Sequence, residues 1–202
     1  MLEKILDEYK ELKVAEKFYP SFHKLKMQTE NACGIASSKN AWMLSFGEDI
    51  PLRELLYKAE HISDNVYKEK VEISKEGIGP TVIAGLARYM GELSGKKVKV
   101  FMTKKGNIKQ LRYLLGKSIA PIIHRGLYED NGGPHYEVVT GISDKHIYFY
   151  NSFRRIRTSG LHRKGIEEFE DRLWNFKGER WFLSFYPSDI TLQRSMFQGR
   201  NM

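Results

Sequence analysis

The chain has 202 residues, 41% of them hydrophobic and 12% aromatic, which suits one folded domain with its own core, or at most two small ones. Its 33 basic residues outnumber its 25 acidic ones and give a net charge of +8, which fits an anionic partner, an acidic substrate or plain solubility. No apolar run predicts a transmembrane helix, and the charged N-terminus does not resemble a secretory signal. We therefore expect a cytoplasmic protein with no membrane partner.

The first half of the chain predicts helices. Apolar residues recur at helical spacing, and Pro20, Gly47 and Gly95 stand where three of the periodic segments end. Pro51 and Pro80 stand in the first turn of two others, a position that proline favours. The predicted helices span residues 2–18, 33–46, 52–59 and 79–93, whereas residues 61–76 carry no clear pattern.

The second half predicts mainly strands. Alternating or aromatic-rich segments indicate strands at 98–102, 136–142, 146–151 and 181–186, with helices at 108–115 and 166–176. The strands at 136–142 and 146–151 are joined by residues 143–145 and predict a β-hairpin. Because helices and strands are segregated along the chain, we expect an α+β fold. We expect one domain over residues 1–187 and a polar, loosely held C-terminal tail over 188–202.

Cys33 is the only cysteine in the chain, so it makes neither an internal disulfide nor a Cys-rich metal site. The six histidines show no metal-ligand spacing, and we expect no metal and no cofactor. Cys33 is therefore either a buried apolar filler or a reactive nucleophile. Asn31 is placed to cap a helix whose first turn holds Cys33, and the N-terminal end of a helix favours a thiolate.

A thiol nucleophile needs a base, a group that orients the base, and donors for an oxyanion. His135 opens one strand of the predicted hairpin and Asn151 ends the other, and a turn centred near residue 143 places the two residues opposite each other. Gln28 precedes Cys33 by five residues, in reach for its amide to join the Cys33 backbone N–H at an oxyanion. Each residue alone is more simply a structural histidine, a turn asparagine or an exposed glutamine. Their order along the chain favours catalysis.

Three runs carry a resemblance to a known family: Gln28-Thr-Glu-Asn-Ala-Cys33-Gly34-Ile-Ala-Ser37, His135-Tyr-Glu-Val-Val-Thr-Gly141 and Tyr148-Phe-Tyr-Asn151. In them the chain resembles the papain-like cysteine peptidase superfamily, and most closely the peptidase C39-like group. The resemblance implies an N-terminal helical lobe whose nucleophile helix packs on a C-terminal antiparallel sheet. It implies that Cys33 is the nucleophile, His135 the general base and acid, Asn151 the orienting residue and Gln28 the oxyanion donor.

The expected activity is hydrolysis of peptide or amide bonds through a thioester on Cys33, with a peptide or protein as substrate. The basic run from Arg154 to Lys164 follows Asn151 directly and fits either an acidic substrate or a solvated loop. The rival hypothesis is a non-catalytic C39-like binding module whose basic surface takes an anionic partner. Nucleic acid is not favoured, because the chain has neither zinc-finger spacing nor an RNA-recognition motif. The sequence leaves open the substrate-binding residues, the oligomeric state and the choice between hydrolysis and acyl transfer.

Overall fold

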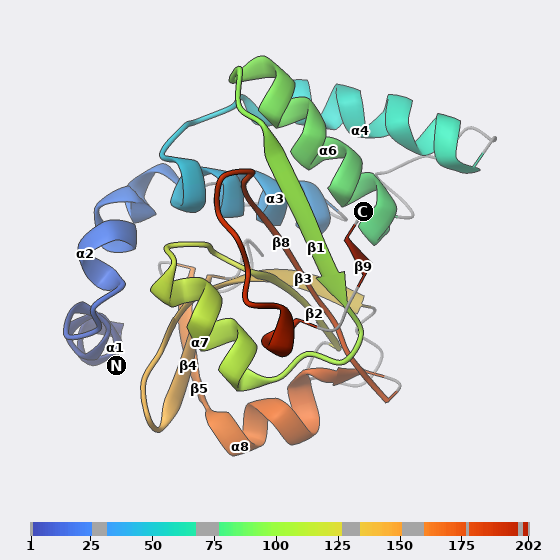
Figure 1. Cartoon of the computed structure of the whole chain (residues 1–202). Helices are drawn as coiled ribbons and strands as arrows, with labels where there is room; N and C mark the ends of the chain where they lie inside the picture. Colours follow the sequence, from blue (N-terminus) through green and yellow to red (C-terminus); the bar gives the residue numbers. More distant parts are fainter. Residues whose placement is uncertain are drawn as a thin grey trace.

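A computed structural model of the chain describes residues 2–25, 32–67, 77–126, 134–150, 160–176, 178–197 and 200–201. Its centre is a seven-stranded sheet in the order β5-β4-β3-β2-β8-β1-β9, in which every neighbouring pair is antiparallel (Figure 1). The strands are β1 Val98–Thr103, β2 Ile122–Gly126, β3 Pro134–Ile142, β4 His146–Tyr150, β5 Leu161–Gly165, β8 Phe182–Pro187 and β9 Arg200–Asn201. A separate two-stranded ribbon joins β6 Asn175–Phe176 to β7 Glu179–Arg180.

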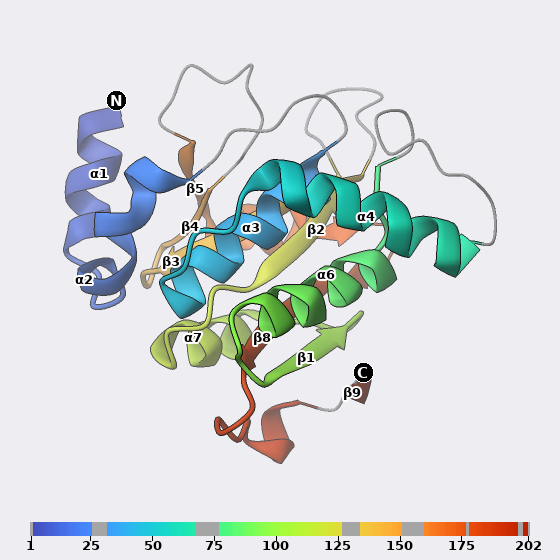
Figure 2. The ribbon, with the colours of Figure 1, turned by 90° about the horizontal axis from the view of Figure 1, so that it is seen from above.

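The helices α3, α4 and α6 pack against one another beside the sheet, and α1 and α2 lie near β5 (Figure 2). Their bounds are α1 Leu2–Lys10, α2 Ala15–Phe18, α3 Cys33–Phe46, α4 Leu52–Tyr67, α6 Pro80–Leu93, α7 Ile108–Gly116 and α8 Ile166–Glu168. Two 3-10 turns, Tyr19–Lys24 and Arg194–Met196, and a π turn, Phe169–Leu173, complete the helical structure. In the part of the chain that the structure describes, no helix combines the length and the apolar character needed to cross a membrane.

The central helix α3 is enclosed by its neighbours almost along its whole length. Most of its side chains are small or apolar, as expected of a helix with no solvent face, although Lys39 and Asn40 are buried as well. It ends at Gly47, whose φ of 77° lies in the left-handed region that glycine adopts at helix ends. The N-cap position is Ala32, with no side-chain cap hydrogen bond, and the expectation that Asn31 caps this helix stays a prediction. Asn31 itself lies outside the described residues.

The α+β expectation is confirmed, and the predicted helix 33–46 agrees with α3 in both bounds. Other elements differ from the prediction. The segment expected as one helix over 2–18 breaks after Lys10 and resumes at Ala15. The helix expected over 166–176 is one α turn and one π turn. Strand β5 was not predicted, because its basic residues follow a polar segment and it pairs only with β4, at the edge of the sheet.

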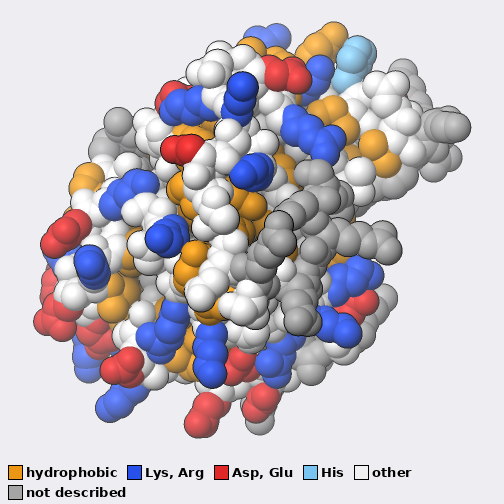
Figure 3. Space-filling model, viewed as in Figure 1, with side chains coloured by type: hydrophobic (Ala, Val, Ile, Leu, Met, Phe, Trp, Pro, Cys, Tyr) orange, Lys and Arg blue, Asp and Glu red, His pale blue; other side chains and the backbone are white. Residues whose placement is uncertain are grey.

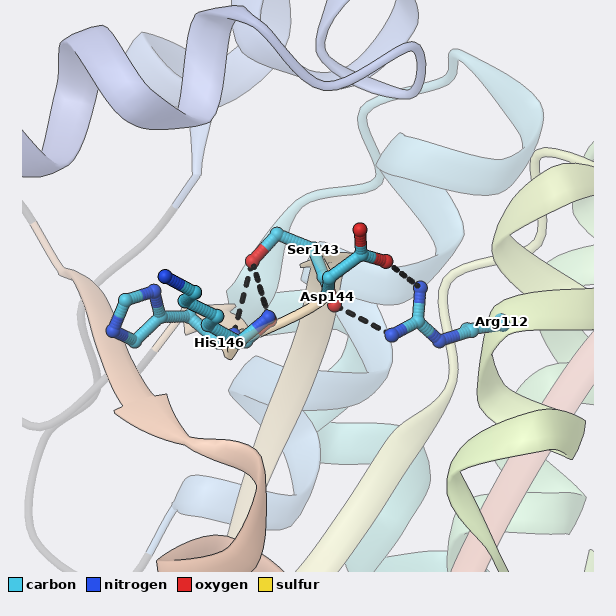
Figure 4. A network of polar contacts seen from close by, with 5 residues as sticks. Arg112, Ser143, Asp144 and His146 are labelled. Carbon is cyan, nitrogen blue, oxygen red and sulfur yellow. Dashed lines mark hydrogen bonds and ion pairs between the residues drawn. The ribbon is translucent and has the colours of Figure 1, made fainter.

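The β3–β4 hairpin has a different register from the predicted one. Val138 pairs with Tyr150 and Ile142 pairs with Ile147, with a bulge after Val139. In the turn, Ser143 N–H donates to the His146 carbonyl at 2.8 Å, and His146 N–H donates to Ser143 Oγ at 2.9 Å (Figure 4). These bonds centre the turn beyond residue 143, and the bulge adds one more residue to β3.

The pairs that the structure describes therefore do not have the predicted register. The predicted pairing of residues 135 and 151 itself stays a prediction. Asn151 lies outside the described residues, so its side chain is not placed. The turn is also held from outside the hairpin, because Arg112 on α7 donates to the Ser143 carbonyl at 2.6 Å (Figure 4).

The expectation of a loosely held tail is wrong for the described residues after Pro187. Ile190, Leu192 and Phe197 pack against the main core, and the Phe197 ring meets Phe101 of β1 edge-on at 5.0 Å. Farther on, β9 pairs with β1. Three apolar residues spread through a polar segment are enough to fix it when each has a core surface to cover. The domain boundary at 187 stays a prediction.

Candidate active site

Cys33 is the first residue of α3, and this end of the helix meets the beginning of β3. The backbone of Tyr136 lies near enough to the Cys33 thiol to lower its pKa. One helical turn farther, Ser37 Oγ donates to the Tyr136 carbonyl at 2.9 Å. Tyr136 directly follows His135 in the sequence. The fold therefore brings Cys33 to the segment of β3 that carries the predicted base, although the two residues are 102 positions apart in the chain.

The surroundings of Cys33 act on its thiol in opposite directions. Burial raises the pKa of the thiol, the backbone groups of Tyr136, Gly34 and Cys33 itself lower it, and the charge of Glu137 raises it further. The net direction is upward, because the cost of desolvating a thiolate exceeds the effect of the backbone donors. The N–H groups at the helix start act on the thiol in the expected direction, but burial outweighs them, so Cys33 needs a base that takes its proton.

The start of α3 supplies hydrogen-bond donors for a negative charge. Ala36 N–H donates to the Ala32 carbonyl at 2.9 Å, and the N–H groups of Cys33 and Gly34 come before this bond. The backbone groups of both residues lower the pKa of the Cys33 thiol. N–H groups in the first turn of a helix have no partner within the helix. They are thus available to an oxyanion formed beside the sulfur.

His135 lies in a buried charged cluster at the start of β3. Its side chain is 3% exposed, and that of Glu137 is 0% exposed. His135 Nε2 and Glu137 Oε1 are 3.9 Å apart, too far for a hydrogen bond but close enough for their charges to interact. Arg125 on β2 is paired in register with His135. Its Nη2 donates to Glu137 Oε1 at 2.6 Å, while its Nε bonds Oε2 of the same carboxylate.

Sequence reasoning missed Arg125 and Glu137. A signal was present for Glu137, because it is the one charged residue in the apolar run from Tyr136 to Val139. It also stands two residues after His135, which is the spacing of neighbours on one face of a strand. Arg125 carried no such signal. Its place beside His135 depends on the β2–β3 register, and sequence pattern does not specify that register.

A second histidine, His124, lies next to Arg125 on β2. Burial lowers its pKa to about 4, and the charge of His135 acts in the same direction. Its ring centroid is 4.8 Å from that of Tyr136. At neutral pH, His124 is therefore an uncharged ring, packed beside the strand that carries His135.

The remaining predicted site residues are only partly described. Gln28 and Asn151 both lie outside the described residues, as does the basic run up to residue 159. The end of that run forms β5, where Arg163 pairs with Glu8 on α1, and Lys164 lies 3.7 Å from Glu168. These two cations are engaged with carboxylates of the chain itself, which favours a structural role over substrate recognition.

Comparison with known proteins identifies the fold. No protein-family model and no curated protein matches the chain. Among solved structures, the peptidase domain of Streptococcus ComA, a bi-functional ABC transporter involved in a quorum-sensing pathway, matches with a TM-score of 0.57 and 16% identity, over 81% of this chain and 98% of that one. The peptidase domain of Streptococcus mutans ComA is also similar, with a TM-score of 0.48 and 15% identity, over 81% of this chain and 99% of that one. The chain has the papain-like α+β fold of the C39 peptidase domain of ComA.

Proposed function

We propose that this protein is a cysteine peptidase or a related thiol amidohydrolase with Cys33 as its nucleophile. The observation that carries the proposal is the docking of the Cys33 end of α3 on β3 next to His135, where Ser37 Oγ bonds the Tyr136 carbonyl and the Tyr136 backbone acts on the Cys33 thiol. The likeness to a peptidase domain supports a fold that can host this chemistry.

In the proposed reaction, Cys33 Sγ attacks the carbonyl carbon of the scissile amide while His135 takes the thiol proton. The C–N bond then breaks, His135 gives the proton to the leaving amine, and the acyl group stays on Cys33 as a thioester. A water molecule attacks the thioester with His135 again as base, which releases the carboxylic acid and restores the thiol. Because burial raises the pKa of Cys33, proton removal during the attack is the step that depends most on His135.

Gln28 as an oxyanion donor and Asn151 as the residue that orients His135 belong to the same proposal, supported by their places in the sequence runs. The proposed substrate is a peptide or protein, with acidic side chains as one option given the net charge of +8. A cytoplasmic location also stays a prediction.

The alternative is a non-catalytic binding module with this fold. The raised pKa of Cys33 favours it, because an inert thiol is what burial in apolar surroundings produces. Its proposed basic surface has less support. On the face shown in Figure 3, Lys and Arg side chains are interspersed with Asp and Glu and do not form one continuous patch.

The test that needs no known substrate is alkylation of Cys33 by iodoacetamide at pH 7 in the wild type and in His135→Ala. The lone cysteine makes the modified site unambiguous by mass spectrometry. We expect His135→Ala to slow alkylation at least about tenfold, since the base is lost. His146→Ala is the matched control, because His146 lies at the turn end of the same hairpin and should leave the rate unchanged.

Turnover completes the test. A mixture of fluorogenic peptide amides, including acidic ones, should be cleaved by the wild type and not by Cys33→Ala or His135→Ala. If His135→Ala is alkylated at the wild-type rate, His135 is not the base for Cys33. The peptidase proposal then fails, and the binding module becomes the better hypothesis.

A further inference from the structure

We propose that the buried ion pair of Arg125 and Glu137 is a positioning pair for His135: it holds the imidazole in place and decides how readily the ring keeps a proton. The catalytic meaning of this inference rests on the proposed function, in which His135 is the base for Cys33. The inference concerns the action of the pair on His135, and the charge of Glu137 also acts on the Cys33 thiol.

The side chains of Arg125, Glu137 and Phe149 hold one another in place. The carboxylate of Glu137 accepts two hydrogen bonds from Arg125, a fork geometry that fixes both side chains. The Arg125 guanidinium lies over the Phe149 ring, with Cζ 5.5 Å from the centroid, and His162 stacks with that same ring at 5.9 Å. Arg125 and Glu137 are both buried. The side chains beside His135 are therefore closely packed and have little freedom to change position.

The placement of this ion pair is unusual for a merely structural role. Replacing a buried ion pair by apolar residues of similar volume is often neutral or stabilising, so stability alone gives little reason for one among the apolar residues of β3. Here the anion lies 3.9 Å from His135 Nε2, and the cation is the residue paired with His135 across the strands. Both charges of the pair are thus next to the one group whose proton the reaction moves.

The two charges act oppositely on His135. The Glu137 carboxylate stabilises an imidazolium, while the Arg125 guanidinium destabilises it. As a pair they oppose each other at His135, one on the same strand and one on the neighbouring strand. Removing one partner leaves the charge of the other uncompensated. Loss of Glu137 should lower the pKa of His135, and loss of Arg125 should raise it.

Several charged or titratable groups pack around His135 and act on its protonation. In the described residues these are His124 and Arg125 on β2, Glu137 on β3, and Cys33 at the start of α3. His162 on β5 joins them through the charges of Glu137 and Arg125. Burial lowers the pKa of both His124 and His162, so each takes up a proton at a lower pH than an ordinary histidine does.

The test is an NMR titration of His135, with its signal assigned from His135→Ala, in the wild type and in three variants. Glu137→Gln should lower the pKa of His135 by about one unit or more, because Arg125 is left unbalanced. Arg125→Met should raise the pKa of His135 for the converse reason. The double variant Glu137→Gln/Arg125→Met should return it close to the wild-type value, and Glu137→Asp, which keeps the charge, should shift it less than Glu137→Gln.

Two controls keep the test decisive. Asp49→Asn removes the anion from another buried cation, Lys39 on α3, and should leave the titration of His135 unchanged. If Glu137→Gln does not fold, because a buried Arg125 without a partner is costly, Arg125→Met and the double variant still give different expectations, a raised and an unchanged pKa of His135. A His135 pKa that stays at the wild-type value in the folded single variants overturns the inference.

The alkylation rate of Cys33 links the pair to catalysis. The pH at which the rate reaches half its neutral value should move with the pKa of His135 in each variant, which a merely structural ion pair would not cause. If the titration responds but His135→Ala leaves alkylation unchanged, the positioning pair stands and the peptidase proposal fails. If His135→Ala slows alkylation but the titration does not respond, only the inference about the pair fails.

Discussion

Ser37 on α3 and Tyr136 on β3 are joined by a hydrogen bond of 2.9 Å in which the serine hydroxyl donates to the backbone carbonyl. Both residues are buried, and they are 99 positions apart in the chain. The bond is one helical turn from Cys33 and one residue from His135. It therefore fixes the distance between the helix that carries the thiol and the strand that carries the base.

Ser37→Ala should cost about 1–3 kcal/mol of unfolding free energy, since it leaves a buried carbonyl without its donor. It should also slow Cys33 alkylation at pH 7, because the first turn of α3 loses its tie to β3. Ser38→Ala is the matched control. Ser38 is buried in the same helix, but its hydroxyl donates to the Gly34 carbonyl within the helix at 2.6 Å. Equal effects of the two substitutions on alkylation would contradict a specific role for the Ser37 bond.

The sequence predicted α3 well because local signals define that helix. An apolar, proline-free run begins at Cys33, and Gly47 supplies the left-handed residue that ends it. The approach of its N-terminus to the strand of His135 followed from the resemblance to a known fold. It did not follow from any local pattern, since the contact joins residues about a hundred positions apart.

The sequence did not predict the parts of the site that depend on strand register. The bulge after Val139 and the side-chain bond of Ser143 shift the β3–β4 pairing away from the predicted one. A single residue of slip changes which side chains face each other. The same limit applies to Arg125, whose place beside His135 is set by pairing between strands β2 and β3. Hydrophobic pattern alone carries no information on that pairing.

Gly34 has no room for a side chain in the first turn of α3. A Cβ at this position would lie 2.6 Å from Ile78 Cγ1 and 3.4 Å from Ile83 Cδ1. Gly34→Ala should therefore destabilise the fold by about 1–3 kcal/mol, although alanine is intrinsically the better helix former by about 1 kcal/mol. Urea unfolding measures the change.

The matched control for this prediction is Gly116→Ala at the end of α7, where a Cβ would meet nothing within 4 Å. That change should not destabilise the protein. Ile78→Ala removes the clashing atoms, so the double variant with Gly34→Ala should lose less than the sum of the two single losses. Additive losses would show that the crowding at Gly34 is relieved elsewhere.

Tyr9 ties the N-terminal helix to the sheet. Its ring is buried, and its hydroxyl donates to the Thr140 carbonyl at 2.9 Å, at the bulge of β3. Tyr9→Phe keeps the ring contacts but leaves this carbonyl without its donor, so we expect a loss of about 1–3 kcal/mol in urea unfolding. Tyr57→Phe, on a side chain that is 65% exposed, should change stability little. No loss in Tyr9→Phe would mean that the ring contacts of Tyr9 and the Glu8–Arg163 ion pair hold α1 without this bond.

His124 should make the fold sensitive to acid. Its pKa is about 4 in the folded protein, lowered mainly by burial, against an ordinary value of 6.5. The unfolded chain therefore takes up a proton at a higher pH than the folded one does, so stability is full above pH 6.5 and falls as the pH drops toward 4. His124→Phe keeps an aromatic ring against Tyr136 but cannot titrate. Allowing for partial exposure, its stability should fall by about 1–2 kcal/mol less than that of the wild type over this range. Urea unfolding at several pH values between 7 and 4 measures the difference, to which His162 contributes equally in both proteins. Parallel curves would mean that His124 becomes protonated without cost, and that its side of the sheet admits water.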